Sequence, residues 1–149
     1  MFEDHHFHLM RVVFHEHAAR WNAAAPGVTK PQYAVLAALA QEPGLDQRTL
    51  AEAAVMTKAA LAELLLRLEE RDLVERRVCP DDSRRRLVSL TRAGAALLDH
   101  ATPIVERINA EMLAPLDEAA QATFLALLQR LRHGGPTSPG PSAAISADR

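Results

Sequence analysis

The chain has 149 residues and a formal net charge of −2, with 48% hydrophobic and only 4% aromatic residues. A chain of this length buries about 68–70% of its unfolded surface, which allows one domain with a real core, and its richness in alanine and leucine favours a mainly α fold over a β-sandwich. Because the chain has one cysteine, Cys79, no apolar run of about 18 residues and no secretory leader pattern, we expect a cytoplasmic protein without disulfides or a membrane partner.

The N-terminal segment, from Asp4 to about Ala25, is predicted to form a helix that buries one side. Its apolar residues recur at steps of three and four positions, which is the helical period. These residues are Phe7, Met10, Phe14, Ala18 and Trp21. After Pro26 and Gly27, the segment Thr29 to Gln32 has the pattern of a capping box with proline in the first turn, which predicts a second helix to about Gln41.

Two further helices, joined by a tight link, are predicted between Asp46 and Arg71. Asp46 is a plausible N-cap for a short helix that carries Leu50, Ala53 and Ala54. Thr57 caps the next helix, whose inward-facing residues are Leu61, Leu64, Leu65 and Leu68. Two short helices around a tight turn indicate a helix-turn-helix.

A β-hairpin is predicted to follow, between Val74 and Leu90. Val74 and Val78 begin one extended run and Leu87, Val88 and Leu90 form the other, around turn residues from Pro80 to Ser83. Between positions 76 and 92 the hairpin carries six arginines against two aspartates, an excess of four positive charges. The near-neutral total charge does not argue against nucleic acid, because phosphate binding depends on where basic residues cluster. The hairpin therefore requires an anionic partner, or else it is an ordinary solvated charged turn.

A long helix is predicted to begin at Thr91, with Pro103 as a bend, and to persist for about seven turns. Its apolar positions are Leu97, Ala101, Ile104, Val105, Ile108, Met112 and Leu116. Pro115 and Asp117 separate it from a last helix whose stripe is Phe124, Leu127, Leu128 and Leu131. Residues 134–149 are rich in Gly, Pro and Ser, which predicts a disordered tail. The long terminal helices exceed what one small winged core can cover, so we expect residues 1–28 and 92–133 to form a homodimer and residues 29–91 to bind DNA.

In this order of elements, the chain resembles the MarR family of winged helix-turn-helix transcription regulators. Three stretches carry the resemblance: TKPQYAVLAAL, TLAEAAVMTKAALAELLLRLEERDLVERR and DDSRRRLVSLTRAG. The last contains the family's wing pattern, which falls here on Asp82, Arg84, Leu90 and Thr91. The resemblance implies a dimeric regulator that binds a pseudo-palindromic operator in double-stranded DNA and is released, if it is a repressor, by a small aromatic or phenolic acid.

The candidate DNA contacts lie on the fourth helix and on the hairpin. We expect Arg84 to enter the minor groove, where A·T pairs present acceptors, and Asp82 to hold its guanidinium. Phosphate contacts are expected from Arg76, Arg77, Arg85 and Arg86. On the fourth helix the candidates are Thr57 and Lys58 for phosphate, Ala59 and Ala60 for thymine methyls, Glu63 for a cytosine amino group, and Arg67.

This chain departs from the family pattern at two places. Relatives usually carry serine, threonine and arginine on the exposed face of the fourth helix, where this chain has Ala59, Ala60, Ala62 and Glu63. Direct base readout should therefore be weaker, and more of the specificity should come from the wing and from DNA shape. Asp72 stands at a helix end where relatives typically have glycine, which predicts local backbone strain.

An effector site is implied by the resemblance rather than by a motif. Arg11 and His15 are four residues apart on one helix face, beside Phe14 and Trp21, and suit an aromatic carboxylate. Ile108 and Met112 would complete the wall of this site. The alternative is that Arg11 forms a dimer salt bridge and Trp21 belongs to the core.

Other functions find less support in the residues. The five histidines between His5 and His17 lack the spacing of a metal site, so no metal or other cofactor is expected, and Cys79 is an unreactive thiol more readily than a redox sensor. No catalytic residues are predicted, because phosphate loops and nucleophile elbows are absent from the sequence. A winged protein-interaction module and a redox- or metal-responsive regulator remain the alternatives to a ligand-responsive DNA-binding protein.

Overall fold

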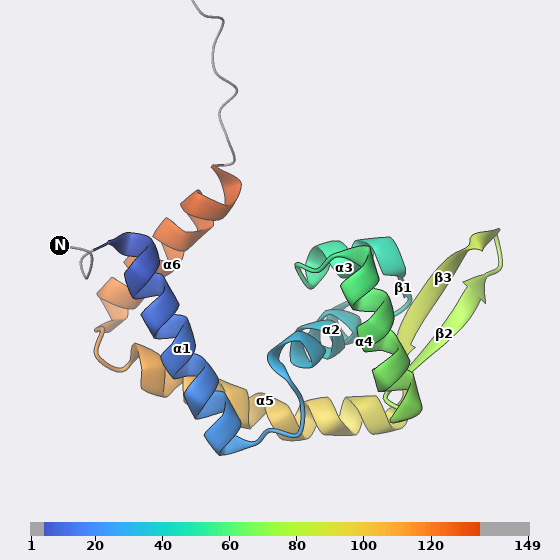
Figure 1. The fold of residues 1–149 in the computed structure, drawn as a ribbon, viewed down its shortest axis with the longest axis horizontal. Coiled ribbons are helices and arrows are strands. Elements are labelled where there is room, and N and C mark those ends of the chain that lie inside the picture. Colours follow the sequence, from blue (N-terminus) through green and yellow to red (C-terminus); the bar gives the residue numbers. More distant parts are fainter. Residues whose placement is uncertain (1–4, 135–149) are drawn as a thin grey trace, which may run out of the picture. The chain divides into compact units, whose positions relative to one another are not determined.

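The structure is a computed structural model, and it describes residues 5–134. In this part of the chain six helices and three strands follow one another (Figure 1). They are α1 (His6–Ala24), α2 (Lys30–Gln41), β1 (Leu45–Asp46), α3 (Gln47–Ala53), α4 (Lys58–Glu70), β2 (Val74–Cys79), β3 (Asp82–Leu90), α5 (Arg92–Leu113) and α6 (Glu118–His133). The chain divides into two units, one ending at Glu111 and one beginning at Met112. The predicted mainly α fold with a winged helix-turn-helix is confirmed.

Helix α2 begins as its sequence predicts. The hydroxyl of Thr29 accepts a hydrogen bond from the backbone N–H of Gln32 at 3.3 Å, and the Gln32 side chain accepts from the backbone N–H of Thr29 at 3.0 Å. This reciprocal pair satisfies two backbone donors at the helix start. Val35, Leu36 and Leu39 follow on the buried face of the helix.

The helix-turn-helix consists of α3 and α4, and both helices begin at the predicted caps. The carboxylate of Asp46 accepts from the backbone N–H of Thr49 at 2.8 Å, and the hydroxyl of Thr57 accepts from that of Ala60 at 3.1 Å. In α3 the buried residues are Leu50 and Ala51, whereas Ala53 is exposed and Ala54, which follows the helix, is partly buried. In α4 the predicted Leu61, Leu65 and Leu68 are buried, and Leu64 is partly buried against them.

Both helices of this motif end in a residue with left-handed backbone that is not glycine. Val55 has φ 55° and Asp72 has φ 57°. After each helix, a backbone N–H reaches back five residues, from Met56 to the carbonyl of Ala51 and from Leu73 to that of Leu68, at 2.9 Å in both cases. These bonds satisfy the last helical carbonyls, which is how a left-handed residue terminates a helix. The predicted departure from favoured backbone at Asp72 is therefore present.

The sheet has three antiparallel strands in the order β1–β3–β2. β1 pairs Leu45 with Val88 and Asp46 with Leu87, and the sequence did not predict this strand because two residues carry no alternation. We call β2, β3 and the turn between them the wing. The turn is shorter than predicted: only Pro80 and Asp81 lie outside the strands, and β3 already begins at Asp82.

The tip of the wing is irregular. Val78 of β2 pairs with Arg86, but the next residue, Cys79, pairs with Asp82. Positions 83–85 of β3 therefore have no partner in register on β2, and they form a bulge. The sequence placed these arginines in a loop, whereas the structure places them on this bulged end of β3.

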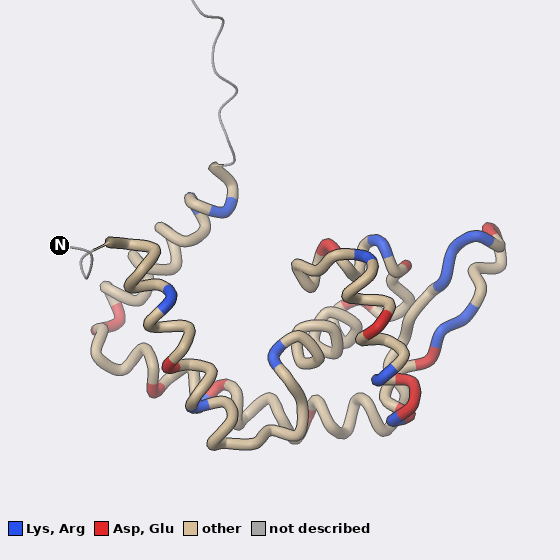
Figure 2. Tube along the Cα trace, in the orientation of Figure 1, with Lys and Arg blue, Asp and Glu red and all other residues tan. Residues whose placement is uncertain are grey.

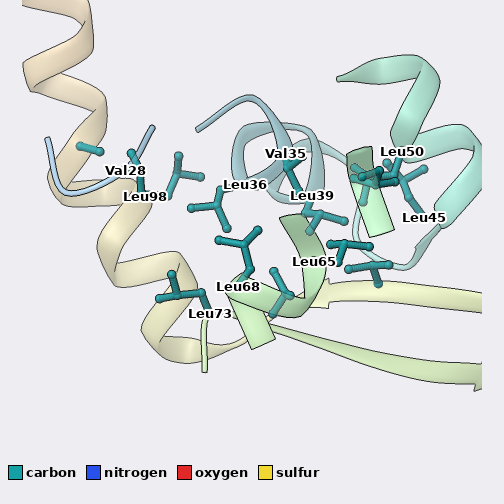
Figure 3. Close-up of a cluster of buried hydrophobic side chains, with 14 of the residues drawn as sticks. Val28, Val35, Leu36, Leu39, Leu45, Leu50, Leu65, Leu68, Leu73 and Leu98 are labelled. Carbon is teal, nitrogen blue, oxygen red and sulfur yellow. The ribbon is translucent and has the colours of Figure 1, made fainter. Parts of the chain in front are cut away.

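The buried side chains of the first unit form one cluster that α2, α3, α4, the sheet and α5 share. Leu36, Leu39, Leu65 and Leu68 lie at its centre, and Leu73 and Leu98 extend it to the start of α5 (Figure 3). Gly94 of α5 lies directly against this region. A Cβ at this position would be only 1.9 Å from the carbonyl oxygen of Leu73, so the first turn of α5 approaches the link between α4 and β2 more closely than any side chain would permit.

Helices α1, α5 and α6 differ from their predictions in what they bury. α1 buries only Trp21, while Phe7 and Phe14 are exposed, and α6 buries none of its residues. α5 ends at Leu113, so the predicted Leu116 lies outside the helix, and its buried set includes Leu98 in addition to Ala101, Val105 and Ile108. The predicted disordered tail lies outside the described residues, apart from Gly134. Within residues 5–134, no helix combines the length and apolar character needed to cross a membrane.

Candidate nucleic-acid interface

The N-terminal turn of α4 is exposed and carries four of the predicted DNA contacts. Thr57, Lys58, Ala59 and Ala60 all face solvent. The hydroxyl of Thr57 caps the helix, so the helix start and the Lys58 ammonium together offer positive potential to an anion. The two alanines add methyl groups but no hydrogen-bond donors from their side chains.

Farther along the same helix, Glu63 and Arg67 form an exposed ion pair. Nη2 of Arg67 lies 2.6 Å from Oε1 of Glu63, with the i, i+4 spacing that brings residues together on one helix face. Sequence reasoning treated the two side chains as separate contacts. In the structure each neutralises the other, so DNA must compete for both.

The arginines of β2 point in different directions. Arg76 donates from Nε and Nη2 to the two carboxylate oxygens of Glu69 in α4, at 2.8 and 2.5 Å. Only about a quarter of each side chain is exposed, 25% for Arg76 and 28% for Glu69. The hydrogen bonds that Arg76 donates to the Glu69 carboxylate raise the pKa of Arg76. Arg77, one residue later, is exposed and pairs with Glu75 on its own strand at 2.9 Å.

Arg84 lies on the bulge of the wing, near the turn at Pro80 and Asp81. The carboxylate of Asp82 accepts a hydrogen bond from the backbone N–H of Arg84 at 2.9 Å, and no contact joins it to the Arg84 guanidinium among the described residues. Asp82 therefore shapes the backbone at this position, whereas the sequence predicted that it would hold the side chain. Arg86 donates to the carbonyl of Ser83 at 3.0 Å within the same strand.

Arg85 is engaged by an acid that sequence reasoning assigned only to a helix cap. Its Nη2 donates to Oδ2 of Asp46 at 2.7 Å, across 39 positions of sequence. The backbone N–H of Thr49 and the guanidinium of Arg85 lower the pKa of Asp46 to about 2. Asp46 thus links three elements, because it pairs in β1, caps α3 and holds the wing.

Arginines gather in the space between α3 and the wing. An open hollow of about 400 Å³ is lined by Arg48, Arg84, Arg85 and Arg86, together with Asp46 and Gln47. Arg48 was not predicted as a site residue, since on the sequence it is one basic residue in a short helix. Figure 2 shows basic positions on both strands of the wing, with acidic ones at its turn and base.

The predicted effector residues are only partly brought together. Arg11 and His15 line an open hollow of about 390 Å³ on α1 together with Val12. Trp21 is 6% exposed, donates from Nε1 to the carbonyl of Val28 at 2.8 Å, and packs edge-on against Tyr33. Ile108 is buried as well, and Met112 lies in the second unit. The structure thus makes Trp21 and Ile108 core residues of the first unit, and their contact with a ligand stays a prediction.

A second hollow, of about 240 Å³, lies beside Trp21. It is lined by Ala18, Trp21, Asn22, Val28, Thr29, Lys30 and Pro31. Burial lowers the pKa of Lys30, which lines this hollow together with Trp21. The sequence gave no signal for this site, because its residues come from a helix end, a loop and a helix start.

No group of three or more His, Cys, Asp or Glu side chains that could hold a metal occurs among residues 5–134. Cys79 is buried at the base of the wing turn. Neither observation adds a redox or metal site to the arginine-rich surface.

Comparison with known proteins identifies the family. A model described as the MarR family matches residues 27–85. The transcriptional regulator HosA of Escherichia coli is 46% identical over 125 residues, which cover 84% of this chain and 93% of HosA. The chain belongs to the MarR family. The transcriptional repressor NicR of Pseudomonas putida, 31% identical over 83% of this chain and 80% of its own length, is a further relative.

Solved structures of MarR-like regulators share the fold. PcaV of Streptomyces coelicolor, in complex with its natural ligand, is 38% identical, covers 89% of this chain and 94% of its own, and has a TM-score of 0.84. BpsR of Bordetella bronchiseptica, whose DNA binding is regulated by 6-hydroxynicotinic acid, is 27% identical over 89% of this chain and 96% of its own, with a TM-score of 0.85. A mutant MarR of E. coli complexed with operator DNA is 27% identical over 83% and 91%, with a TM-score of 0.77. The present chain is therefore a transcription regulator of the MarR family.

Proposed function

We propose that this regulator is a homodimeric repressor that binds a pseudo-palindromic operator in double-stranded DNA and leaves it when a small aromatic carboxylate binds. The observation that carries the proposal is that an exposed start of α4 and an arginine-bearing wing are built on one shared hydrophobic core. A helix of this size fits the major groove, and an arginine at a wing tip fits the narrow minor groove.

The contacts divide into those that position the protein and those that read sequence. Lys58 and the start of α4 bind phosphate, as do Arg77 and Arg86, which are exposed on the wing. Ala59 and Ala60 lie against thymine methyls, and Glu63 and Arg67 approach base edges or the groove rim. Arg84 reads the minor groove. With few donors on α4, the larger share of discrimination falls to Arg84 and to DNA shape.

Support for a small aromatic acid comes from the hollows and from two relatives. PcaV is described with its natural ligand, and BpsR with 6-hydroxynicotinic acid. In this chain, Arg11 and His15 line one hollow, and Lys30 lies beside Trp21 in the other. A guanidinium or ammonium near an aromatic wall suits an aromatic carboxylate.

DNA binding is tested by fluorescence anisotropy with a duplex from the region upstream of the chain's own gene. The protein should bind at low salt, and Arg84→Ala should weaken binding at least about fivefold, since a well-made contact to a base contributes about 1–3 kcal/mol. Arg107→Ala, an exposed arginine of α5, is the matched control and should bind as the unmutated protein does. No binding at low salt, or equal losses in both variants, would contradict the proposal.

Effector binding is tested by thermal shift with a panel of monocyclic aromatic acids. An acid that raises the melting temperature should also release the operator duplex, because a ligand stabilises the state to which it binds. The shift should disappear in Arg11→Ala and persist in Lys30→Ala. The reverse result moves the site to the hollow beside Trp21, and full shifts in both variants would remove both sites from the proposal.

A further inference from the structure

Two arginines of the wing differ from their immediate neighbours because acids of the helix-turn-helix hold them. Arg76 makes a two-pronged contact with Glu69 of α4, and Arg85 contacts Asp46 at the start of α3. Arg77 and Arg86, the next residue in each strand, contact only groups of their own strand among the described residues. β2 therefore carries one arginine that reaches the helix-turn-helix and one that does not, and on β3 only Arg85 of the three arginines does so.

The outer wing has few other connections to the helices. β1 pairs with β3 only at Leu87 and Val88. Between positions 78 and 86, the contact of Arg85 with Asp46 is the one hydrogen bond or ion pair that links the wing to another element of the described chain. The contact of Arg85 with Asp46, and at the base of the wing the contact of Arg76 with Glu69, therefore hold the backbone of Arg84 at its distance from the start of α4.

We propose that Arg76 and Arg85 are positioning residues that fix the wing against α3 and α4, and that they do not contact DNA. The inference rests on the proposed DNA-binding function and changes the role of two residues within it. For Arg76 to reach a phosphate, it would have to leave the Glu69 carboxylate partly buried and without its partner, which is costly. Arg85 would likewise leave the Asp46 carboxylate, which is 20% exposed, without its guanidinium partner. The cost is smaller for Arg85, because its own side chain is 52% exposed.

The direction in which DNA affinity changes when the acid is neutralised separates the two roles. If Arg76 and Arg85 contacted phosphate, Glu69→Gln and Asp46→Asn would release them and remove negative charge near DNA, so binding would tighten. If they position the wing, the same substitutions loosen it and binding weakens. Asparagine is as good an N-cap as aspartate, so Asp46→Asn leaves the start of α3 capped.

The first experiment measures anisotropy of an operator duplex with the full chain. Glu69→Gln and Asp46→Asn should each weaken binding at least fivefold and reduce the preference for A·T over G·C pairs beneath the wing, while circular dichroism melting stays within a few degrees of the unmutated protein. The loss of A·T preference is the readout that a general loss of stability would not produce. Unchanged or tighter binding by both variants would overturn the proposal.

The second experiment compares neighbours in sequence by the salt dependence of binding, from about 50 to about 200 mM salt. The slope of log K against log salt is negative, and each lost phosphate contact makes it shallower by about 0.9. Arg77→Gln and Arg86→Gln should make the slope shallower by about that amount per protomer, whereas Arg76→Gln and Arg85→Gln should reduce affinity and leave the slope unchanged. A shallower slope for Arg76→Gln and Arg85→Gln would overturn the inference.

A variant in which Glu69 and Arg76 exchange their charges distinguishes loss of the ion pair from loss of folding. The double variant Glu69→Arg, Arg76→Glu should recover binding that Arg76→Glu alone loses, because the pair is restored with its partners reversed. No recovery in a folded double variant would identify Arg76 as a DNA contact. Absence of binding by the unmutated protein at low salt would instead overturn the DNA-binding function itself, so the two failures are distinguishable.

Discussion

Val55 holds a left-handed backbone although it is β-branched, in the tight link between α3 and α4. For such a residue this conformation is an outlier, and strain of this kind costs about 1–3 kcal/mol. The side chain is 87% exposed, so it gains little packing in return. The strain is local and is compensated by the hydrogen bond from Met56 to Ala51, which closes α3.

Val55→Gly should therefore stabilise the protein by about 1 kcal/mol, the relief of strain less the 0.4–1 kcal/mol or so by which glycine favours the unfolded chain. Urea unfolding monitored by circular dichroism measures the change. Val78→Gly, at a half-exposed strand position with ordinary backbone, is the matched control and should destabilise. A loss of stability in Val55→Gly equal to that of the control would show that position 55 carries no strain.

Gly94 is required for the opposite reason, because a lack of space for a side chain, and not an unusual backbone conformation, requires glycine there. An added Cβ would meet the carbonyl of Leu73 at 1.9 Å, and backbone cannot move aside as a flexible side chain can. Gly94→Ala should cost more than about 3 kcal/mol, or prevent folding. Ala93→Gly, on the exposed side of the same turn, should cost only about 1 kcal/mol in the same urea titration. Similar values for the two variants would contradict the close contact.

Among the elements, α3 depends on Asp46 more than on any other polar residue at its start. The pKa of Asp46 is depressed to about 2, first by the backbone N–H of Thr49 and then by Arg85. A depressed carboxylate pKa stabilises the fold above the ordinary value, near 4, and this contribution is lost as the pH falls toward 2.

The melting temperatures of the unmutated protein and Asp46→Asn should therefore differ most above about pH 4 and converge as the pH falls to about 2. The comparison between variants removes the contribution of all other carboxylates, which titrate in both. Circular dichroism melts across this range measure the gap. A gap that stays constant down to pH 2 would mean that the charge of Asp46 does not contribute to the fold.

These elements show that local features could be predicted from the sequence, whereas contacts between distant segments could not. The caps at Thr29, Asp46 and Thr57 were predicted correctly, because a cap depends on residues within four positions of each other. The pairing of Asp46 with Arg85 was not predicted, since 39 residues separate them and no local pattern records which carboxylate an arginine will meet. The contact of Arg76 with Glu69 was not predicted either, since it joins a helix end to a strand, whereas sequence reasoning gave Arg76 only a phosphate to contact. The strand β1 was missed because it is two residues long.

At the scale of the whole molecule, α1 leaves large apolar residues without cover in the part of the chain that the structure describes, as α6 does with Phe124, Leu125, Leu127 and Leu131. Phe7, Leu9, Val12, Val13 and Phe14 are all exposed. Phe7 and Phe14, seven residues apart, lie on one face of the helix, and large apolar side chains exposed together indicate an interaction site. A twofold partner would also present two reading heads to a pseudo-palindrome.

We predict a dimer at micromolar concentration, measured as twice the chain mass by light scattering. Phe14→Asp should shift the mass toward that of the monomer and weaken operator binding together with it, because burying a charge in an apolar interface is costly. Leu66→Asp, at an exposed position of α4, is a control that should leave the mass unchanged. A monomeric mass for the unmutated protein would contradict the proposed assembly.

Arg76 and Arg77 are adjacent, yet the alternation of side chains along a strand sends one to Glu69 and leaves the other in solvent. A slip of β2 by one position would exchange their places, and it would also turn Val74 away from the core that now buries it. The ion pair at the base of the wing therefore favours the native register of β2, because only the pairing that brings Arg76 to α4 satisfies the acid and the core at once. Insertions of one residue in β2 should be far less tolerated in evolution than insertions in the turn at Pro80 and Asp81.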